Sequence, residues 1–277
     1  MVNENATVGK TPDGTVYRIF GEGEPIILIH GVGLNQSVWE HQVTHFSKTH
    51  QVVTYDTLGH GGTKNPSNKA NLAEYSNQLL ALMDALNIDK ASIIGHSMGA
   101  LVALDFALTN PTRSFRVGAL SGVFMRGEAE SEAVLNRVKQ LQLSGINGFI
   151  DSAISRWFGN PVPEALRTSE SIVRSAFSVL DPLGYLRAYQ VFAVSDRTNA
   201  LRLANLNVPA LFLTGELDAN SSPAMSQSMA QRVLDAEVVI ISGAGHMINM
   251  THPVQVNDSI GRLLLRQVAD GATVNFE

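Results

Sequence analysis

The chain alternates short, almost continuously apolar runs with stretches of helical periodicity, and this alternation restricts its fold more than any other feature. Runs that are apolar at nearly every residue suit strands covered on both faces, and strands separated by helices are typical of βαβ units. Strands are predicted at residues 15–20, 26–30, 51–55, 91–95, 117–121, 210–214 and 237–241. Helices are predicted at residues 36–47, 72–87, 98–109, 223–233 and 253–268. The sequence therefore predicts an α/β fold, with a mostly parallel central sheet flanked by helices.

The alternation stops between about residues 124 and 203, where no buried strand is evident. Amphipathic segments at residues 128–143 and 164–179 occupy this stretch instead, and breakers at residues 144–145, 159–161 and 181–184 separate the segments. We expect an inserted helical lid (cap) at residues 124–203. The core would then consist of residues 1–123 and 204–277.

A serine between two glycines connects one predicted strand to the next helix. The run Gly95-His96-Ser97-Met98-Gly99 joins the strand at 91–95 to the helix at 98–109. This is a G-x-S-x-G pattern in a strand–turn–helix context. A serine at the tip of so sharp a turn holds an unfavourable backbone angle, and glycines two residues to either side remove Cβ atoms that would clash. We therefore predict that Ser97 is a nucleophile, with a helix N-terminus beside it to stabilise an oxyanion.

An aspartate and a histidine follow the last two predicted strands. Asp218 comes just after the strand at 210–214, and His246 comes just after the strand at 237–241. Because parallel strands end at one edge of a sheet, both side chains are expected near Ser97, in the chain order Ser…Asp…His. We predict that His246 is the general base and that Asp218 orients it. Glu216, two residues before Asp218, remains an alternative for the acid.

A glycine-rich turn follows the strand at 26–30. It reads His-Gly-Val-Gly at residues 30–33, and its glycines would let backbone amides approach a substrate oxygen. We predict that the amides of Val32 and Met98 form the oxyanion hole and that Gly31 lies against the substrate. His60 is expected to support a loop near this region, and His96 is expected to point away from Ser97.

The predicted lid is rich in arginine and aromatic residues. It contains eight of the fourteen arginines of the chain, together with eight acidic residues, so most of these arginines are expected on the solvated surface. An arginine that faces the cleft would bind a substrate carboxylate through two hydrogen bonds. Arg126 and Arg156 are the predicted substrate-binding arginines, and Trp157 is expected to form an apolar wall.

The composition restricts the classes of partner. The net charge of -5 leaves no basic stripe for a phosphate backbone, so we expect a small-molecule substrate and no nucleic acid. The absence of cysteine excludes disulfides and thiolate nucleophiles. The N-terminus lacks a signal-peptide pattern, and no apolar run approaches the roughly 20 residues of a membrane helix. We expect a cytoplasmic monomer or homodimer with no membrane partner, no metal and no organic cofactor.

These motifs, together with Asp-Thr-Leu-Gly-His-Gly at residues 56–61 and Gly-Glu-Leu-Asp at 215–218, resemble the α/β-hydrolase superfamily along nearly the whole chain except the lid. Within that superfamily the chain is similar to small bacterial carboxylesterases and enol-lactone hydrolases, including 3-oxoadipate enol-lactonases. The resemblance implies an α/β-hydrolase fold. It also implies a serine hydrolase that cleaves an ester or lactone through an acyl-enzyme.

Two departures limit the alternatives. Haloalkane dehalogenases and epoxide hydrolases of this fold use aspartate at the position of Ser97, so the resemblance disfavours those reactions. C–C hydrolases usually carry asparagine at the position of His96. A C–C bond or amide hydrolase remains open, as does a ligand-sensing receptor that keeps the three residues.

Overall fold

A single eight-stranded sheet forms the centre of the molecule, whose computed structural model describes residues 6–146 and 148–267. The strands are β1 (Thr7–Lys10), β2 (Val16–Phe20), β3 (Pro25–Ile29), β4 (Gln51–Tyr55), β5 (Ala91–His96), β6 (Ser114–Leu120), β7 (Ala210–Gly215) and β8 (Ala236–Ile241). Their order is β1-β2-β4-β3-β5-β6-β7-β8. The pairs β1–β2 and β2–β4 are antiparallel and every other pair is parallel. The predicted α/β class and mostly parallel sheet are confirmed.

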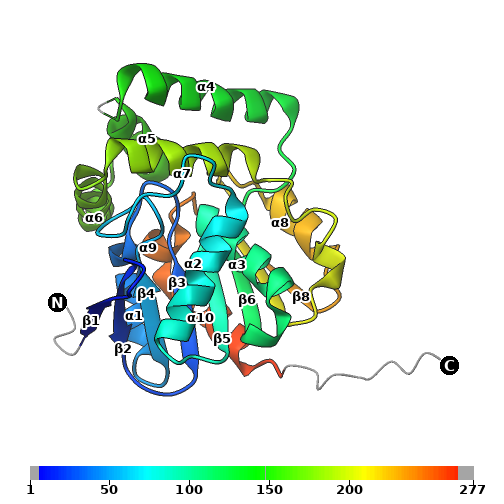
Figure 1. Cartoon of the computed structure of the whole chain (residues 1–277). Helices are drawn as coiled ribbons and strands as arrows, with labels where there is room; N and C mark the ends of the chain where they lie inside the picture. Colours follow the sequence, from blue (N-terminus) through cyan, green and yellow to red (C-terminus); the bar gives the residue numbers. More distant parts are fainter. Residues whose placement is uncertain (1–5, 147, 268–277) are drawn as a thin grey trace.

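Helices cover both faces of this sheet. They are α1 (Glu40–Phe46), α2 (Leu72–Ala85), α3 (Met98–Thr109), α4 (Glu128–Ser144), α5 (Phe149–Phe158), α6 (Arg167–Ser178), α7 (Pro182–Val194), α8 (Pro223–Ala230), α9 (Ile248–Thr251) and α10 (Pro253–Leu265). Short 3₁₀ turns lie at Gln36–Trp39, Pro111–Arg113, Glu164–Leu166 and Leu203–Asn205. In Figure 1, α2 and α3 pack together in front of the strands, and α10, against which α1 packs, lies behind them.

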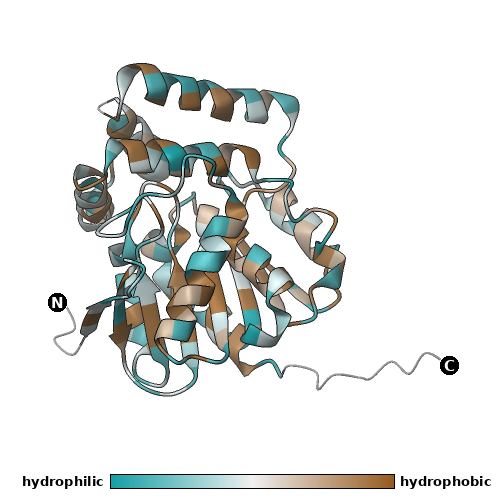
Figure 2. Ribbon diagram, viewed as in Figure 1, coloured by the Kyte–Doolittle hydropathy of each residue, from teal (hydrophilic) through white to brown (hydrophobic). Residues whose placement is uncertain are grey.

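The central strands are buried because their apolar side chains are covered from both sides. All residues of β5 and β7 are buried. Figure 2 shows brown residues gathered in the central strands, whereas α2, in front of them, carries teal residues as well as brown ones. Large side chains, among them Trp39 and Phe106 from flanking elements and Phe212 from β7, are completely buried in the same core. Burial on this scale holds the strand ends, and the loops that follow them, in fixed positions.

Local signals explain where several helices begin and end. The side chain of Asn71 accepts a hydrogen bond from the Glu74 amide and caps α2. Pro223 and Pro253 occupy the first turns of α8 and α10, as predicted. The predicted last helix reached residue 268, which lies outside the described residues, and α10 ends at Leu265.

Two differences from the predicted elements have physical causes. The strand β1 was not predicted, because its four residues carry no apolar run and most of them are exposed. The segment at 181–184 was predicted as a break, but α7 begins there. Asp181 caps the helix by accepting a hydrogen bond from the Gly184 amide, and Pro182 occupies the first turn.

The helices α4, α5, α6 and α7 lie together above the sheet at the top of Figure 1. They fall between β6 and β7 in the chain, and no strand occurs in that interval within the described residues. The helices pack in pairs, α4 against α7 and α5 against α6. Across residues 6–146 and 148–267, no helix is long and apolar enough to cross a membrane.

Candidate active site

The turn that carries Ser97 is held in a strained conformation by backbone contacts. Ser97 has a φ of 56°, in the left-handed region that non-glycine residues seldom adopt. A Cβ at Gly95 would collide with the carbonyl oxygen of Gly99, and a Cβ at Gly99 would collide with that of Ile29. The Ser97 amide donates a 2.8 Å hydrogen bond to the carbonyl of Leu120. The turn therefore requires glycine at both flanking positions, as the sequence predicts.

Ser97, His246 and Asp218 form a continuous hydrogen-bonded chain. His246 Nε2 lies 3.1 Å from Ser97 Oγ, and His246 Nδ1 lies 2.8 Å from Asp218 Oδ2. All three side chains are buried. In this order a carboxylate fixes the imidazole orientation, and the imidazole can take a proton from the hydroxyl.

Asp218 is held as an anion by a local turn. Its Oδ1 accepts hydrogen bonds from the amides of Asn220, at 2.9 Å, and Ser221, at 3.0 Å. Burial by itself raises the pKa of Asp218, but the charge of His246 and these hydrogen bonds outweigh burial, and the pKa is lowered. At Gly215, just before this turn, a Cβ would collide with the carbonyl oxygen of Ala244.

Glu216, the alternative acid, points elsewhere. Its Oε2 accepts hydrogen bonds from Ser242 Oγ at 2.7 Å and from the Gly243 amide at 2.9 Å, and these bonds lower its pKa. The side chain is exposed. The structure therefore brings Asp218 to His246 and places Glu216 on the surface.

The glycine-rich turn after β3 lies against the nucleophile. A Cβ at Gly31 would be 2.9 Å from the Cβ of Ser97. Any side chain at residue 31 would therefore prevent this close approach of the turn to Ser97. Val32 lines the same cavity as Ser97, and Met98 is the first residue of α3. Both backbone positions predicted for the oxyanion hole are thus beside Ser97.

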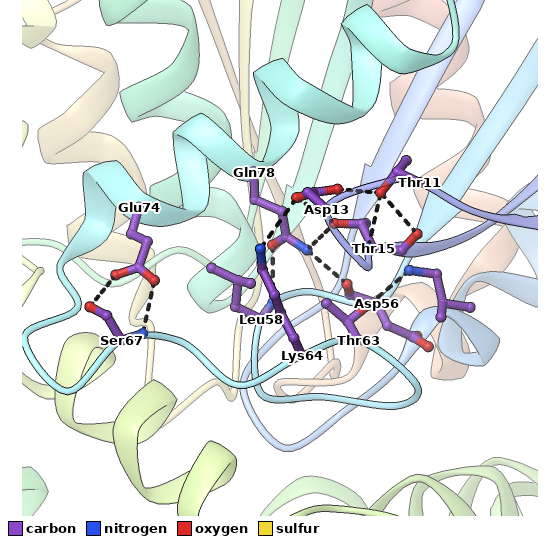
Figure 3. Close-up of polar contacts among 11 residues, drawn as sticks. Thr11, Asp13, Thr15, Asp56, Leu58, Thr63, Lys64, Ser67, Glu74 and Gln78 are labelled. Carbon is purple, nitrogen blue, oxygen red and sulfur yellow. Dashed lines mark hydrogen bonds and ion pairs between the residues drawn. The ribbon is translucent and has the colours of Figure 1, made fainter.

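His60 supports this turn through a backbone hydrogen bond. The Gly33 amide donates to His60 Nε2 at 2.9 Å, so the other ring nitrogen carries the proton. His60 belongs to the loop after β4, which Gln78 of α2 anchors: Gln78 accepts from the Leu58 amide and donates to the Asp56 carbonyl. Figure 3 shows these contacts, with Gln78 between the loop and the neighbouring Thr15.

Three histidines around the site are buried and neutral. Burial lowers the pKa of His30 to about 4 and the pKa values of His60 and His96 to about 3 each. His96 Nε2 lies 2.8 Å from the backbone carbonyl oxygen of His246. The His30 Nε2 accepts from the Thr57 amide at 3.0 Å. These neutral rings connect the site loops to one another.

A cavity of about 330 Å³ opens over Ser97 and His246. Its walls come mainly from α4, α5, α6 and α7, and these aromatic side chains line it: Phe149, Trp157, Phe177, Tyr185, Tyr189 and Phe192. Trp157 stacks on the imidazole of His246, with the ring centroids 6.0 Å apart and the planes at 29°. Trp157 therefore contacts the histidine as well as forming a wall.

Both arginines predicted to bind substrate, Arg126 and Arg156, line this cavity. Arg137 lines it too and was missed. The helical spacing of Glu130, Ala133 and Arg137 puts them on one face of α4, but that spacing does not tell which face of the helix borders a cavity.

Four of the other arginines in this stretch make structural contacts elsewhere. Arg167 and Arg174 pair with Glu170, Arg187 donates to the Pro66 carbonyl, and Arg202 pairs with Asp105.

Comparisons with known proteins agree with this geometry. A model of the alpha/beta hydrolase family matches residues 26–259. An Acinetobacter baylyi protein, (E)-2-((N-methylformamido)methylene)succinate hydrolase, is 33% identical over 240 residues, which cover 87% of this chain and 90% of the relative. The 3-oxoadipate enol-lactonase 2 of the same organism is 25% identical over 255 residues, which cover 90% of this chain and 92% of the relative.

Comparison with solved structures also finds hydrolases of this fold. The crystal structure of the enol-lactonase from Burkholderia xenovorans LB400 matches with a TM-score of 0.86 and 26% identity, over 94% of this chain and 100% of that one. The relatives are named as hydrolases and enol-lactonases, and the protein is an enzyme of this hydrolase class. The chain belongs to the alpha/beta hydrolase family.

Proposed function

We propose that the protein is a serine hydrolase that cleaves a small carboxylic ester or enol-lactone through an acyl-enzyme. The observation that carries this proposal is the unbroken chain from Asp218 through His246 to Ser97 Oγ, beneath a cavity of about 330 Å³. Similarity to named enol-lactonases supports the choice of bond.

The reaction would proceed in two steps. In the first, His246 Nε2 takes the proton of Ser97 as the serine oxygen attacks the carbonyl carbon, and the amides of Val32 and Met98 stabilise the oxyanion. His246 then gives that proton to the leaving alkoxide or enolate, and the acyl group stays on Ser97. In the second step, His246 deprotonates water, which attacks the acyl carbon. His246 then returns the proton to Ser97 Oγ as the serine leaves and the acid is released.

A second candidate is cleavage of an amide-type bond by the same residues. It is favoured by the relative at 33% identity, whose named substrate is a succinate with an N-methylformamido group. Acylation of Ser97 would be common to both reactions. The leaving group would be an amine in the second, so product analysis with matched esters and amides separates the two.

The test is covalent labelling together with turnover. We expect a fluorophosphonate probe to attach one label per molecule of the wild type, at Ser97, with loss of fluoride. The Ser97→Ala variant should fold normally, bind no label and hydrolyse esters several orders of magnitude more slowly.

Ser121 provides a matched control. It is also buried, follows the neighbouring strand β6 and has a φ of 49°, but it does not line the cavity. Ser121→Ala should keep both label and turnover. Esterase activity that persists in pure Ser97→Ala protein would refute the proposal.

A further inference from the structure

One guanidinium in the cavity wall has an unused donor. The side chain of Arg126 is only 3% exposed, yet its Nη2 has no hydrogen-bond partner within the described residues. Its Nη1 is occupied: it lies 3.4 Å from Asp196 Oδ1 and 3.5 Å from the Phe192 carbonyl. The group also sits over the Phe192 ring at 4.5 Å. A buried charged donor without an acceptor is costly, and an acceptor that entered the cavity would remove that cost.

Two further arginines border the same cavity. Arg137 comes from α4 and Arg156 from α5. Burial lowers the pKa values of Arg126 and Arg156, and the charge of Arg137 lowers both further, so Arg137 lies within electrostatic range of each of the other two. Among the described residues, only Arg126 of these three forms an ion pair with a carboxylate.

The local charge favours one anion. Glu130 also borders the cavity, but it is already bonded to the Gly127 amide. The three arginines exceed Asp196 and Glu130 by one positive charge. A carboxylate carries one negative charge, and its two oxygens match the donors of a guanidinium.

We propose that Arg126, Arg137 and Arg156 form a carboxylate-binding subsite, so that the preferred substrate carries a carboxylate separate from the bond that is cleaved. This inference rests on the proposed function, because the same cavity contains Ser97. Arg126 is held in place by Asp196 and supplies Nη2. Arg137 and Arg156 approach from α4 and α5, and their positive charges balance the negative charge of the substrate carboxylate and of Glu130. Such a subsite aligns the scissile carbonyl by holding the far end of the substrate.

The kinetic test uses pairs of phenyl esters with equal carbon chains. Phenyl hydrogen glutarate and phenyl hydrogen adipate carry the carboxylate, and phenyl pentanoate and phenyl hexanoate do not. We expect the wild type to favour the anionic member by roughly 10- to 100-fold in kcat/KM, the range of one or two charge-assisted hydrogen bonds. Arg126→Met and Arg137→Gln should lose most of this preference, measured as the ratio of kcat/KM for the anionic and the neutral member of each pair.

Arg187→Gln is the matched control, because Arg187 lies on α7 outside this cavity and bonds to the Pro66 carbonyl. It should keep the preference. Arg137→Gln guards against misfolding, since that change leaves the Arg126–Asp196 pair intact. Equal rates for the two members of each pair in the wild type, or an unchanged preference in both cavity variants, would overturn the proposal.

A binding measurement separates this proposal from the proposed reaction. In Ser97→Ala protein, which should not turn over, adipate is expected to raise the melting temperature and uncharged adipamide is not. In the double variant that combines Ser97→Ala with Arg137→Gln, adipate should no longer raise the melting temperature. A shift with inorganic phosphate but none with adipate would refute a carboxylate site even if the esterase reaction were correct.

Discussion

Lowering the pH from 7 to 5 should strongly destabilise the folded protein, because His30, His60 and His96 are buried in neutral form. Their pKa values in the folded protein are about 4, 3 and 3, against a usual value of 6.5. The unfolded chain therefore binds protons below pH 6.5, whereas the folded protein does not. The stabilisation is fully present above pH 6.5 and is lost as the pH falls toward the folded values.

The size of the loss depends little on the folded pKa values. At pH 5 each ring is protonated in the unfolded chain and still neutral in the folded protein, so each contributes a loss of about 2 kcal/mol relative to pH 7. Three rings together give about 6 kcal/mol, which is comparable with the whole stability of a typical domain at roughly 5–15 kcal/mol.

Urea unfolding at pH 7, 6 and 5 measures this loss directly. His60→Gln keeps an acceptor for the Gly33 amide but removes one titrating ring, so its free energy of unfolding should fall by about 2 kcal/mol less than that of the wild type. His41→Gln, changed at an exposed position, is the control and should follow the wild type. A wild-type loss below about 2 kcal/mol, or equal losses in wild type and His60→Gln, would refute this account of the buried histidines.

Two further predictions concern the groups around His246. Asp218→Asn should lower kcat by roughly 10⁴-fold, because the amide no longer favours the imidazole tautomer that accepts the serine proton, whereas Glu216→Gln should leave kcat unchanged. Steady-state kinetics of the two variants measures both effects, and the reverse pattern of losses would show that Asp218 is not the acid. In the same assay, Trp157→Leu should lower kcat roughly fivefold and Trp157→Phe by less, because an aromatic face stabilises the imidazolium by about 1 kcal/mol. An equal loss of kcat in both variants would mean that Trp157 acts through packing alone.

The central strands and the three polar loops could be predicted because their signals are local. A run that is apolar throughout predicts a strand that is covered on both faces. The glycines two residues to either side of Ser97 predict a sharp turn. The order of Asp218 and His246 after the last two strands then brings them to one edge. The strand β1 lacked such a signal, since its position depends on pairing with β2.

The arginine subsite depends on packing that no local pattern contains. Arg137 faces the cavity because α4 packs against α7, and its helical face alone does not say which side is covered. Arg126 is fixed by Asp196, seventy positions further along the chain. The start of α7 was missed for another reason. Asp181 and Pro182 form a pair that is typical of a break between helices and also of the first residues of a helix.

The glycine contacts at the strand ends have a consequence for how such proteins diverge. At Gly95, Gly99 and Gly215 the neighbouring atoms are main-chain carbonyl oxygens, so backbone meets backbone where the reactive loops come together. The spacing of those loops is then set by atoms that every sequence possesses. The helices that shape the cavity take no part in these backbone contacts, so many of their side chains can change while the contacts around the serine stay the same. A lineage can therefore acquire new substrates while inheriting its chemistry unchanged.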